Sequence, residues 1–407
     1  MAAVIMTRMA ASLRVSRWSS ACVVVVAAIA VVAAPAAARR PQKEVTNPVT
    51  FVDDTSYSWS TPKWVVTREL MGVTTIDQMK PAGVNSGGFI DKAGNLRIIY
   101  TTMGNLLGKA SAISKDGGAT WSVDTAFVFP SGLKDGVGHF AVTTAPGGGY
   151  RAFARDDVGI VSITSTDGQT WVADPGYRVT VAALGIAATD GAGVVQQPDG
   201  KYRMYLGDES SYFRTCGSTR PVSTVIHSAT STDQITWTVD PDYRIGPELT
   251  ELCKLHPHAF RDSNGDVVAV FHINNYVEKG RSEWTSSCFF GRSKDGTSFP
   301  SIQRVPIGLA SDFGGEVGAS DCDVVMMPDK TVRLFFSQSG KVGMAIGTPM
   351  LTIKCQKGKL KKTLTGTAPV CPKGWVRLKT ITCTKGKIVK TVTAAKPVCP
   401  KGYKKST

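Results

Sequence analysis

Hydrophobic and polar positions alternate through the middle of the chain in short runs that tight turns separate. One example is the run FAVTTAP at Phe140–Pro146, which three glycines join to YRAFAR at Tyr150–Arg155. Period-two alternation over runs of this length predicts β-strands, and Gly-Gly, Asp-Gly or Asn-Gly between two such runs predicts a hairpin. The pattern therefore predicts antiparallel sheet throughout this part of the chain.

Two kinds of turn recur along these strands. The first kind joins an apolar strand to an alternating one, and its copies are DKAGNLR (Asp91–Arg97), APGGGYR (Ala145–Arg151), QPDGKYR (Gln197–Arg203), RDSNGDVV (Arg261–Val268) and MPDKTVR (Met327–Arg333). The second kind precedes the last strand of each unit, and its copies are SKDGGATW (Ser114–Trp121), STDGQTW (Ser165–Trp171), STDQITW (Ser231–Trp237) and SKDGTSF (Ser293–Phe299). Copies of the second kind begin 51, 66 and 62 residues apart. Such recurrence indicates repeated supersecondary units.

Each unit is predicted to be a four-stranded antiparallel meander. Five units are expected, at residues 85–130, 137–182, 190–246, 256–308 and 318–348. The fifth has three strands, so the segment 39–84 is expected to supply its outer strand from Phe51–Asp54 or Trp64–Leu70. Closing a ring with strands from both chain ends is how β-propellers protect their sheet edges. The predicted fold is therefore all-β, a β-propeller of five blades over 85–349, with six blades as the alternative if 45–84 forms its own blade.

The second turn resembles the Asp box, or BNR repeat, of sialidases and other secreted β-propellers. The first copy fits that family's pattern S-x-D-x-G-x-T-W, the second and third are one residue shorter, and the fourth has Phe299 in place of Trp. Its Asp can accept backbone N–H groups two residues further on, and its aromatic is expected to pack into the blade. In the family these turns lie on the face away from the active site, so the resemblance implies the scaffold.

Sialic acid cleavage does not follow from this resemblance. Sialidases clamp the substrate carboxylate with three arginines, the first in an Arg-Ile/Leu-Pro phrase ahead of the first Asp box, and nothing before Ser114 matches that phrase. Arg304 stands in similar letters but in the wrong blade, and Arg155 and Arg214 complete no triad. The five-blade count instead resembles propeller glycosidases of the arabinofuranosidase/xylosidase and fructosidase kind, which draw three carboxylates from different blades.

The first 38 residues read as a secretory signal peptide. Three arginines precede an apolar run over 21–34, and alanines at 36–38 offer a cleavage site, with an uncleaved anchor as the alternative. No other stretch approaches a membrane span, so we expect a secreted, monomeric protein. Without Cys22 eight cysteines remain, an even number that favours disulfides in an oxidising compartment. The simplest pairing within the propeller is Cys216–Cys253 and Cys288–Cys322.

The composition changes abruptly after residue 349. Residues 350–407 contain two copies of a 28-residue repeat, and the net charge of +15 belongs to this tail, which holds fourteen Lys and one Arg and no acidic residue. Each repeat is expected to form its own disulfide, Cys355–Cys371 and Cys383–Cys399, around short strands. A unit with so few apolar residues cannot build a stable hydrophobic core and needs a covalent cross-link. Clustered lysines favour binding to anionic cell-wall polymers. A solubilising spacer is the alternative, and nucleic acid is not expected.

The candidate site lies opposite the repeated Asp turns, at the starts of first strands and in the loops after second strands. Four of the five histidines and about ten carboxylates fall there. Glycoside hydrolysis needs paired carboxylates, and the catalytic candidates are Asp190, Glu209, Asp321 and Asp323. The substrate-binding candidates are His139, Arg155, Asp157, His256, His258, His272 and Asn274. No cofactor or metal is assigned, although a structural cation near His258 is an open alternative because His256 and His258 can face one side of a strand.

The predicted function is hydrolysis of a glycosidic bond in an extracellular glycan by carboxylates in the centre of the propeller. The alternative is a non-catalytic propeller that binds glycan or envelope with the same residues and is held at the cell surface by the basic tail. A purely structural adhesin is a third hypothesis. Neither the sugar nor the linkage follows from the sequence.

Overall fold

The structure is a computed structural model that describes residues 51–406 except 68, 71–85, 103–107, 135, 211–223, 247–252, 278–283, 308–317 and 339–340. The predicted signal peptide at 1–38 lies outside the described residues. The only helix in the described part is the single turn α1 (Val181–Leu184). Across the same part of the chain, no helix has the length and apolar content that a bilayer span needs.

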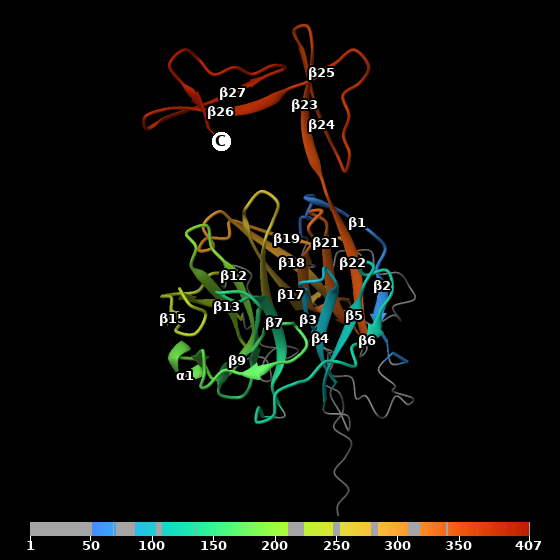
Figure 1. The fold of residues 1–407 in the computed structure, drawn as a ribbon, viewed down its shortest axis with the longest axis vertical. Helices are drawn as coiled ribbons and strands as arrows, with labels where there is room; N and C mark the ends of the chain where they lie inside the picture. Colours follow the sequence, from blue (N-terminus) through green and yellow to red (C-terminus); the bar gives the residue numbers. More distant parts are fainter. Residues whose placement is uncertain are drawn as a thin grey trace, which may run out of the picture. The chain divides into compact units, whose positions relative to one another are not determined.

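The strands up to residue 349 form five antiparallel sheets, four of which follow one another along the chain (Figure 1). The first contains β3 (Ser86–Ile90), β4 (Leu96–Thr102), β5 (Gly108–Ser114) and β6 (Ser122–Val123), and the second contains β7 (Gly138–Thr144), β8 (Tyr150–Arg155), β9 (Gly159–Ser165), β10 (Val172–Ala173) and β11 (Val179–Thr180). The third contains β12 (Thr189–Gln196), β13 (Tyr202–Asp208), β14 (Ile226–Ser231) and β15 (Thr238–Val239), and the fourth contains β16 (Cys253–Arg261), β17 (Val267–Val277), β18 (Trp284–Ser293) and β19 (Ser301–Arg304). Each sheet is one blade, numbered one to four.

The fifth blade combines strands from distant parts of the chain. It contains β20 (Ser320–Met326), β21 (Val332–Gln338) and β22 (Lys341–Pro349), completed by β1 (Tyr57–Trp59) and β2 (Lys63–Val66). Tyr57 lies opposite Pro349 and Lys63 opposite Met344, and Figure 1 shows β1 and β2 beside β22. Described residues of the N-terminal segment thus complete the fifth blade and form no sixth. The strands are shifted from expectation, because Phe51–Asp54 makes only one bridge, Asp53 to Arg304 of the fourth blade.

The five blades close into a ring. The innermost strands β3, β7, β12, β16 and β20 contact one another in that order, and β20 in turn contacts β3. A closed ring of radial antiparallel sheets is a β-propeller. The predicted fold class, all-β with five blades, is therefore confirmed.

The hydrophobic core is divided into five clusters, each between two neighbouring blades. The aromatic that ends each repeated Asp turn belongs to one of them. It makes an edge-to-face contact with an aromatic of the preceding blade, in the pairs Trp121–Phe335, Trp171–Phe89, Trp237–Phe153 and Phe299–Tyr205. We expected this aromatic to pack into its own blade. The structure instead places it at the blade interface, where it stabilises both blades.

The repeated turns are held by short hydrogen bonds. In the second copy the Ser165 hydroxyl accepts the Gly168 N–H at 2.8 Å, and the Asp167 carboxylate accepts the Gln169 and Thr170 N–H groups at 2.8 and 2.9 Å. The third and fourth copies repeat these contacts. In the longer first copy the bonded N–H groups lie one residue further on. In all four turns, therefore, a Ser hydroxyl and an Asp carboxylate accept backbone N–H groups of the turn.

Three of the four expected disulfides are present in the described residues. Cys288 on β18 and Cys322 on β20 join the fourth and fifth blades, and both are fully buried. Cys355–Cys371 and Cys383–Cys399 each close a loop of 16 residues in the tail. The expected pair Cys216–Cys253 is not tested, because Cys216 and the side chain of Cys253 lie outside the described residues.

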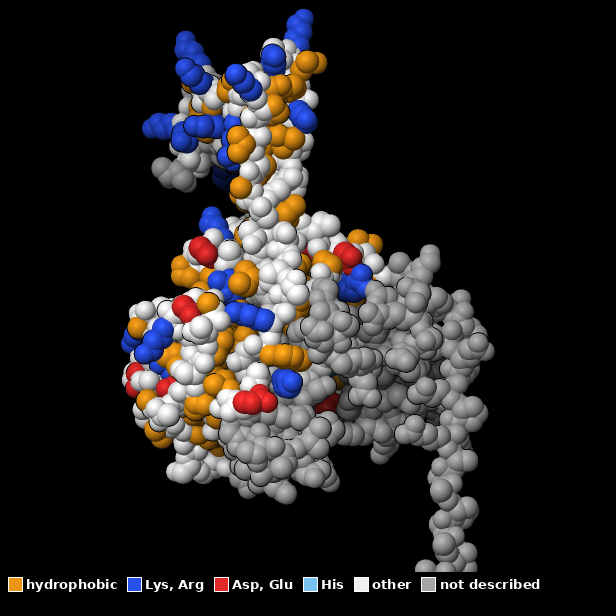
Figure 2. Space-filling view, turned by 90° about the vertical axis from the view of Figure 1, so that its right-hand side faces the viewer, with side chains coloured by type: hydrophobic (Ala, Val, Ile, Leu, Met, Phe, Trp, Pro, Cys, Tyr) orange, Lys and Arg blue, Asp and Glu red, His pale blue; other side chains and the backbone are white. Residues whose placement is uncertain are grey.

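Each tail repeat is a small three-stranded sheet. The first contains β23 (Leu351–Lys357), β24 (Leu360–Gly366) and β25 (Val376–Arg377), and the second contains β26 (Lys379–Lys385), β27 (Ile388–Ala394) and β28 (Lys404–Lys405). In each sheet only a few side chains, such as Cys355 and Cys383, are buried. Figure 2 shows blue Lys and Arg side chains spread over these repeats. The disulfide replaces the missing core, as expected of so small a unit.

Candidate functional site

A β-bulge positions the candidate residues. In the inner strands of blades two to five, one extra residue interrupts the pairing with the second strand at the same place. The bulged residue has a left-handed backbone in all four strands, with φ of 58° at His139, 61° at Gly191, 52° at His256 and 49° at Asp321. Bulges re-aim side chains and are enriched beside active sites. Here they direct two histidines and one aspartate toward the end of the ring opposite the repeated turns.

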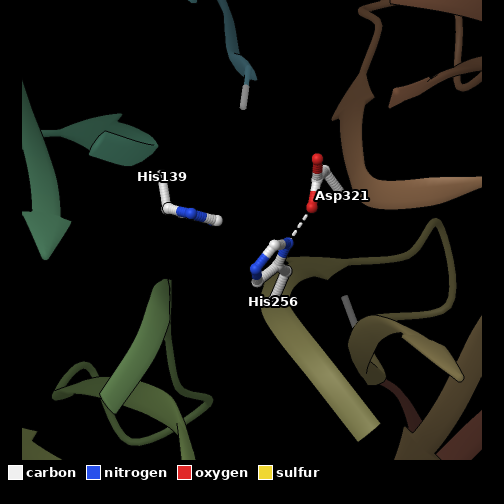
Figure 3. A group of neighbouring side chains, drawn as sticks. All are labelled: His139, His256 and Asp321. Carbon is white, nitrogen blue, oxygen red and sulfur yellow. Dashed lines mark ion pairs between the residues drawn. The ribbon is translucent and has the colours of Figure 1, made fainter. Parts of the chain in front are cut away.

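His256 lies between two carboxylates from neighbouring blades. Its Nε2 is 2.6 Å from Asp190 Oδ1, and its backbone N–H donates to Asp190 Oδ2 at 2.8 Å. Its Nδ1 contacts Asp321 Oδ1 (Figure 3). The backbone N–H of Asp321 donates to His272 Nδ1 at 3.0 Å. We call these four residues and His139 the central cluster, because strands β7, β12, β16, β17 and β20 all contribute to it.

His139 links the central cluster to a second acidic group. Its ring centroid is 3.9 Å from that of His256, and its Nδ1 is 3.6 Å from Asp190 Oδ1. On its other side, Arg155 places a guanidinium nitrogen 3.4 Å from His139 Nε2 and 4.0 Å from Glu209 Oε2. Glu209 follows β13 and is buried. A carboxyl and a guanidinium therefore lie next to the cluster.

A second His–Asp pair lies two residues further along the same two strands. His258 Nδ1 is 2.7 Å from Asp323 Oδ1, and Asp323 Oδ2 accepts the Gly88 N–H at 2.5 Å. The inner strands approach closely here, since a Cβ on Gly193 would lie 2.5 Å from His258 Cα. Blades three, four and five thus meet at this level through a glycine, a histidine and an aspartate.

Burial and neighbouring charge set the protonation of these groups. Burial and the nearby Asp190 carboxylate raise the pKa of Glu209 to about 7, against the opposite effect of Arg155. Burial raises the pKa of Asp190, but His256, His139 and His272 outweigh it and hold that pKa below its usual range. Burial, reinforced by the charge of His256, lowers the pKa of His139 and His272 well below the ordinary histidine value.

Most of the candidate residues lie close together. The structure brings together His139, Arg155, Asp190, Glu209, His256, His272 and Asp321, and pairs His258 with Asp323 just below them. Asp157 is exposed and pairs with Lys134 at 2.8 Å, a surface contact that leaves it outside the group. The Asn274 side chain lies outside the described residues. These positions leave the predicted catalytic and binding roles as predictions.

Two glycines of the site escaped the sequence analysis. Gly191 adopts the left-handed bulge conformation in the third blade, and Gly193 lets the inner strands of blades three and four approach. Both occur in TDGAGVV, inside a predicted strand, and glycine within a strand is itself a signal of a bulge or a close backbone approach. That signal was available in the sequence.

No family model matches the sequence, and no curated protein matches it. Among solved structures, the chain is similar to an α-L-arabinofuranosidase from Fusarium graminearum, with 11% identity and a TM-score of 0.47 over 72% of this chain and 98% of the other. It is similar to an α-L-arabinanase from Penicillium chrysogenum, with 15% identity and a TM-score of 0.44 over 79% and 86%. It is also similar to an endo-arabinase from Bacteroides thetaiotaomicron, with 15% identity and a TM-score of 0.48 over 66% and 94%.

Proposed function

We propose that this protein hydrolyses a glycosidic bond of an extracellular glycan, with Glu209 as the proton donor. The observation that carries the proposal is the state of the Glu209 carboxyl. It is buried at the end of the ring that also holds the central cluster, and its pKa is raised to about 7. A carboxylic acid that remains protonated near neutral pH can protonate the oxygen of a leaving sugar. Water then adds to the anomeric carbon in place of that oxygen and gives up a proton, which restores the acid form of Glu209.

Asp190 is the ionised partner of Glu209 in this proposal. Its side chain is fully buried and both its oxygens face His256, so it does not touch the sugar. It acts through its charge, which keeps the proton on Glu209 and favours the positive charge that develops on the sugar ring in the transition state. Arg155, beside Glu209 and partly exposed, is placed to hold a hydroxyl of the substrate.

The setting of the protein supports an extracellular substrate. Three disulfides among the described residues are typical of proteins that fold in an oxidising compartment, and the first 38 residues read as a signal peptide. We further propose that residues 351–407 attract anionic wall polymers, because their lysines are exposed on two stapled sheets. Binding of the full chain to teichoic acid should then weaken as salt rises and be lost on removal of these residues.

The test of hydrolysis is the substitution Glu209→Gln, which keeps the shape of the side chain and removes the acid. Turnover should be screened on a panel of 4-nitrophenyl glycosides and polysaccharides, with arabinofuranosides and arabinan included. On the best substrate, Glu209→Gln should lower kcat by about 10²–10⁴-fold while glycan binding by calorimetry persists.

The matched control is Asp199→Asn, an equivalent loss of charge in the exposed turn at the other end of the same blade. It should change kcat by less than about twofold, as surface substitutions usually do little. Wild-type kcat in Glu209→Gln would exclude Glu209 as the acid. Glycan binding with no turnover by the wild-type protein across the panel would establish the non-catalytic alternative instead.

A further inference from the structure

We propose that His139, His256 and Asp321 bind one divalent transition-metal ion, of the zinc class, at the end of the ring. Each residue comes from a different blade and offers one ligand atom. These atoms all lie within 4.8 Å of one another, and Figure 3 shows the three side chains directed toward one another. A tetrahedral zinc ion with bonds of about 2.0–2.2 Å separates its ligands by roughly 3.4 Å, so modest side-chain shifts complete the site.

The surroundings of His256 favour a metal at its Nδ1. Its Nε2 lies 2.6 Å from the buried Asp190 carboxylate, which favours the tautomer with the proton on Nε2. Nδ1 is buried, makes no hydrogen bond within the described part of the chain, and contacts Asp321 Oδ1. When the His256 ring is neutral in this tautomer, the Nδ1 lone pair faces a carboxylate oxygen, and a bound cation takes the place of the second proton that the charged ring carries. A carboxylate on the far nitrogen of a ligating histidine is the usual arrangement at zinc sites.

The ligand types select the kind of ion. Two imidazoles and one carboxylate suit Zn²⁺ and its first-row neighbours, whereas Ca²⁺ and Mg²⁺ prefer oxygen ligands alone. The negative charge of Asp321 and of the adjacent Asp190 balances a divalent ion. Arg155 approaches His139 at Nε2, at 3.4 Å, and His139 Nδ1 is the ring nitrogen on the side of the cluster, 3.6 Å from Asp190 Oδ1.

The backbone supplies an independent argument. His139, His256 and Asp321 hold left-handed conformations that glycine adopts without strain, and the third blade has Gly191 at the equivalent bulge. A non-glycine residue there costs about 1–3 kcal/mol. Blades two, four and five have a strained non-glycine residue at the bulge, and the side chains of these three residues converge. Blade three has glycine there, which carries no strain and has no side chain. Strain of this kind, observed in the backbone, points to function at those side chains.

The inference does not rest on glycoside hydrolysis, because it concerns binding of an ion in the absence of substrate. The full-length protein should be stripped with dipicolinate and titrated with ZnCl₂ by calorimetry, with bound metal counted by mass spectrometry. One Zn²⁺ per chain is expected. Asp190→Asn should weaken binding by about 10–100-fold, since it removes the carboxylate that orients His256.

The decisive variant is His139→Gly, which matches Gly191 and keeps the bulge conformation. It should remove zinc binding while its circular dichroism and melting temperature in the metal-free state stay at or above wild type. His256→Ala should also lose the ion. The control His227→Ala alters a half-buried histidine on β14, away from the cluster, and should bind zinc as the wild type does.

Two outcomes would overturn the inference. One is the absence of stoichiometric zinc on the wild-type chain at micromolar concentrations, and the other is unchanged zinc binding in both His139→Gly and His256→Ala. Glu209→Gln separates this inference from the proposed function, because that variant should lose turnover and still bind one zinc. Unchanged turnover in that variant would contradict the proposed function alone, whereas a wild-type chain that turns over glycan and binds no zinc would contradict the metal site alone.

Discussion

The two ends of the propeller use the same repeat in opposite ways. At one end, four blades carry a Ser, an Asp and an aromatic residue (Trp in three, Phe in the fourth) that make equivalent hydrogen bonds and an equivalent interface contact. At the other end, four blades share a bulge, but its residue is His, Gly, His and Asp in turn. Repetition at the first end builds the scaffold. Departure from repetition at the second end assembles groups of different chemistry around one point.

The largest effect on stability is expected from the charge at the cluster end. Folding raises the pKa of Glu209 from 4.5 to about 7, so the folded chain binds its proton more tightly than the unfolded chain does. The contribution of Glu209 to the free energy of unfolding should therefore fall as pH rises from 4.5 to 7 and stay constant at higher pH. Glu209→Gln removes this loss. Its advantage in unfolding free energy should be near zero at pH 4.5 and grow to about 3 kcal/mol above pH 7.

Denaturant unfolding of both proteins at pH 4.5, 6 and 8 measures this difference. Asp190 and Arg155 are the charged groups that act on Glu209, and both remain in the variant. A difference that does not change with pH would show that the Glu209 carboxyl is ionised in the folded protein. That result would also remove the basis for assigning it as the acid.

A smaller and pH-independent effect is expected where the inner strands meet. Gly193→Ala places a Cβ 2.5 Å from the Cα and C atoms of His258, which are backbone and cannot swing aside. The blades must separate, at a cost of about 2 kcal/mol. Chemical denaturation measures the cost, and Gly136→Ala supplies the control, since nothing lies within 4 Å of a Cβ there and its φ is outside the left-handed region. Equal losses in the two variants would show that the blades do not touch at Gly193.

The smallest effects are expected at the repeated turns, where they should add. Ser165→Ala and Ser231→Ala each leave a buried backbone N–H without its acceptor, at about 1 kcal/mol. The turns belong to different blades, so the double variant should lose the sum of the two. Neither change should alter turnover or zinc binding. A loss of activity without a loss of stability would mean that the two ends are not functionally separate.

The sequence predicted the blades well because turn chemistry is local. Asp, Gly and Ser define each hairpin within a few residues, and the spacing of these hairpins along the chain predicted the number of blades. It also predicted that most of the candidate histidines and carboxylates share one end of the ring, where the structure brings them together, since strand direction follows from the same turns. Asp157 shows the limit: its position in a loop after a second strand was right, but the pairing with Lys134 depends on a neighbouring loop.

The remaining features depend on contacts between blades, which no local pattern encodes. The destination of Trp171 in the preceding blade follows from the packing of two sheets. The extra residue at His256 is a bulge that shows only when two strands are paired. The outer strand at Tyr57–Trp59 was placed a few residues away, since several nearby segments have similar β character.

The pairing of β1 with β22 has a consequence for how the chain acquires its structure. Tyr57 on β1 pairs with Pro349 on β22, 292 positions later, so β1 cannot join its sheet until β22 has formed. Each of the first four blades can form from residues that are close in sequence. The pairing of β1 with β22, by contrast, closes a very long loop and carries a larger loss of conformational entropy. Until β1 and β22 pair, the first and fifth blades expose unpaired strand edges. The folding intermediate in which the ring is still open is therefore the species most prone to aggregate.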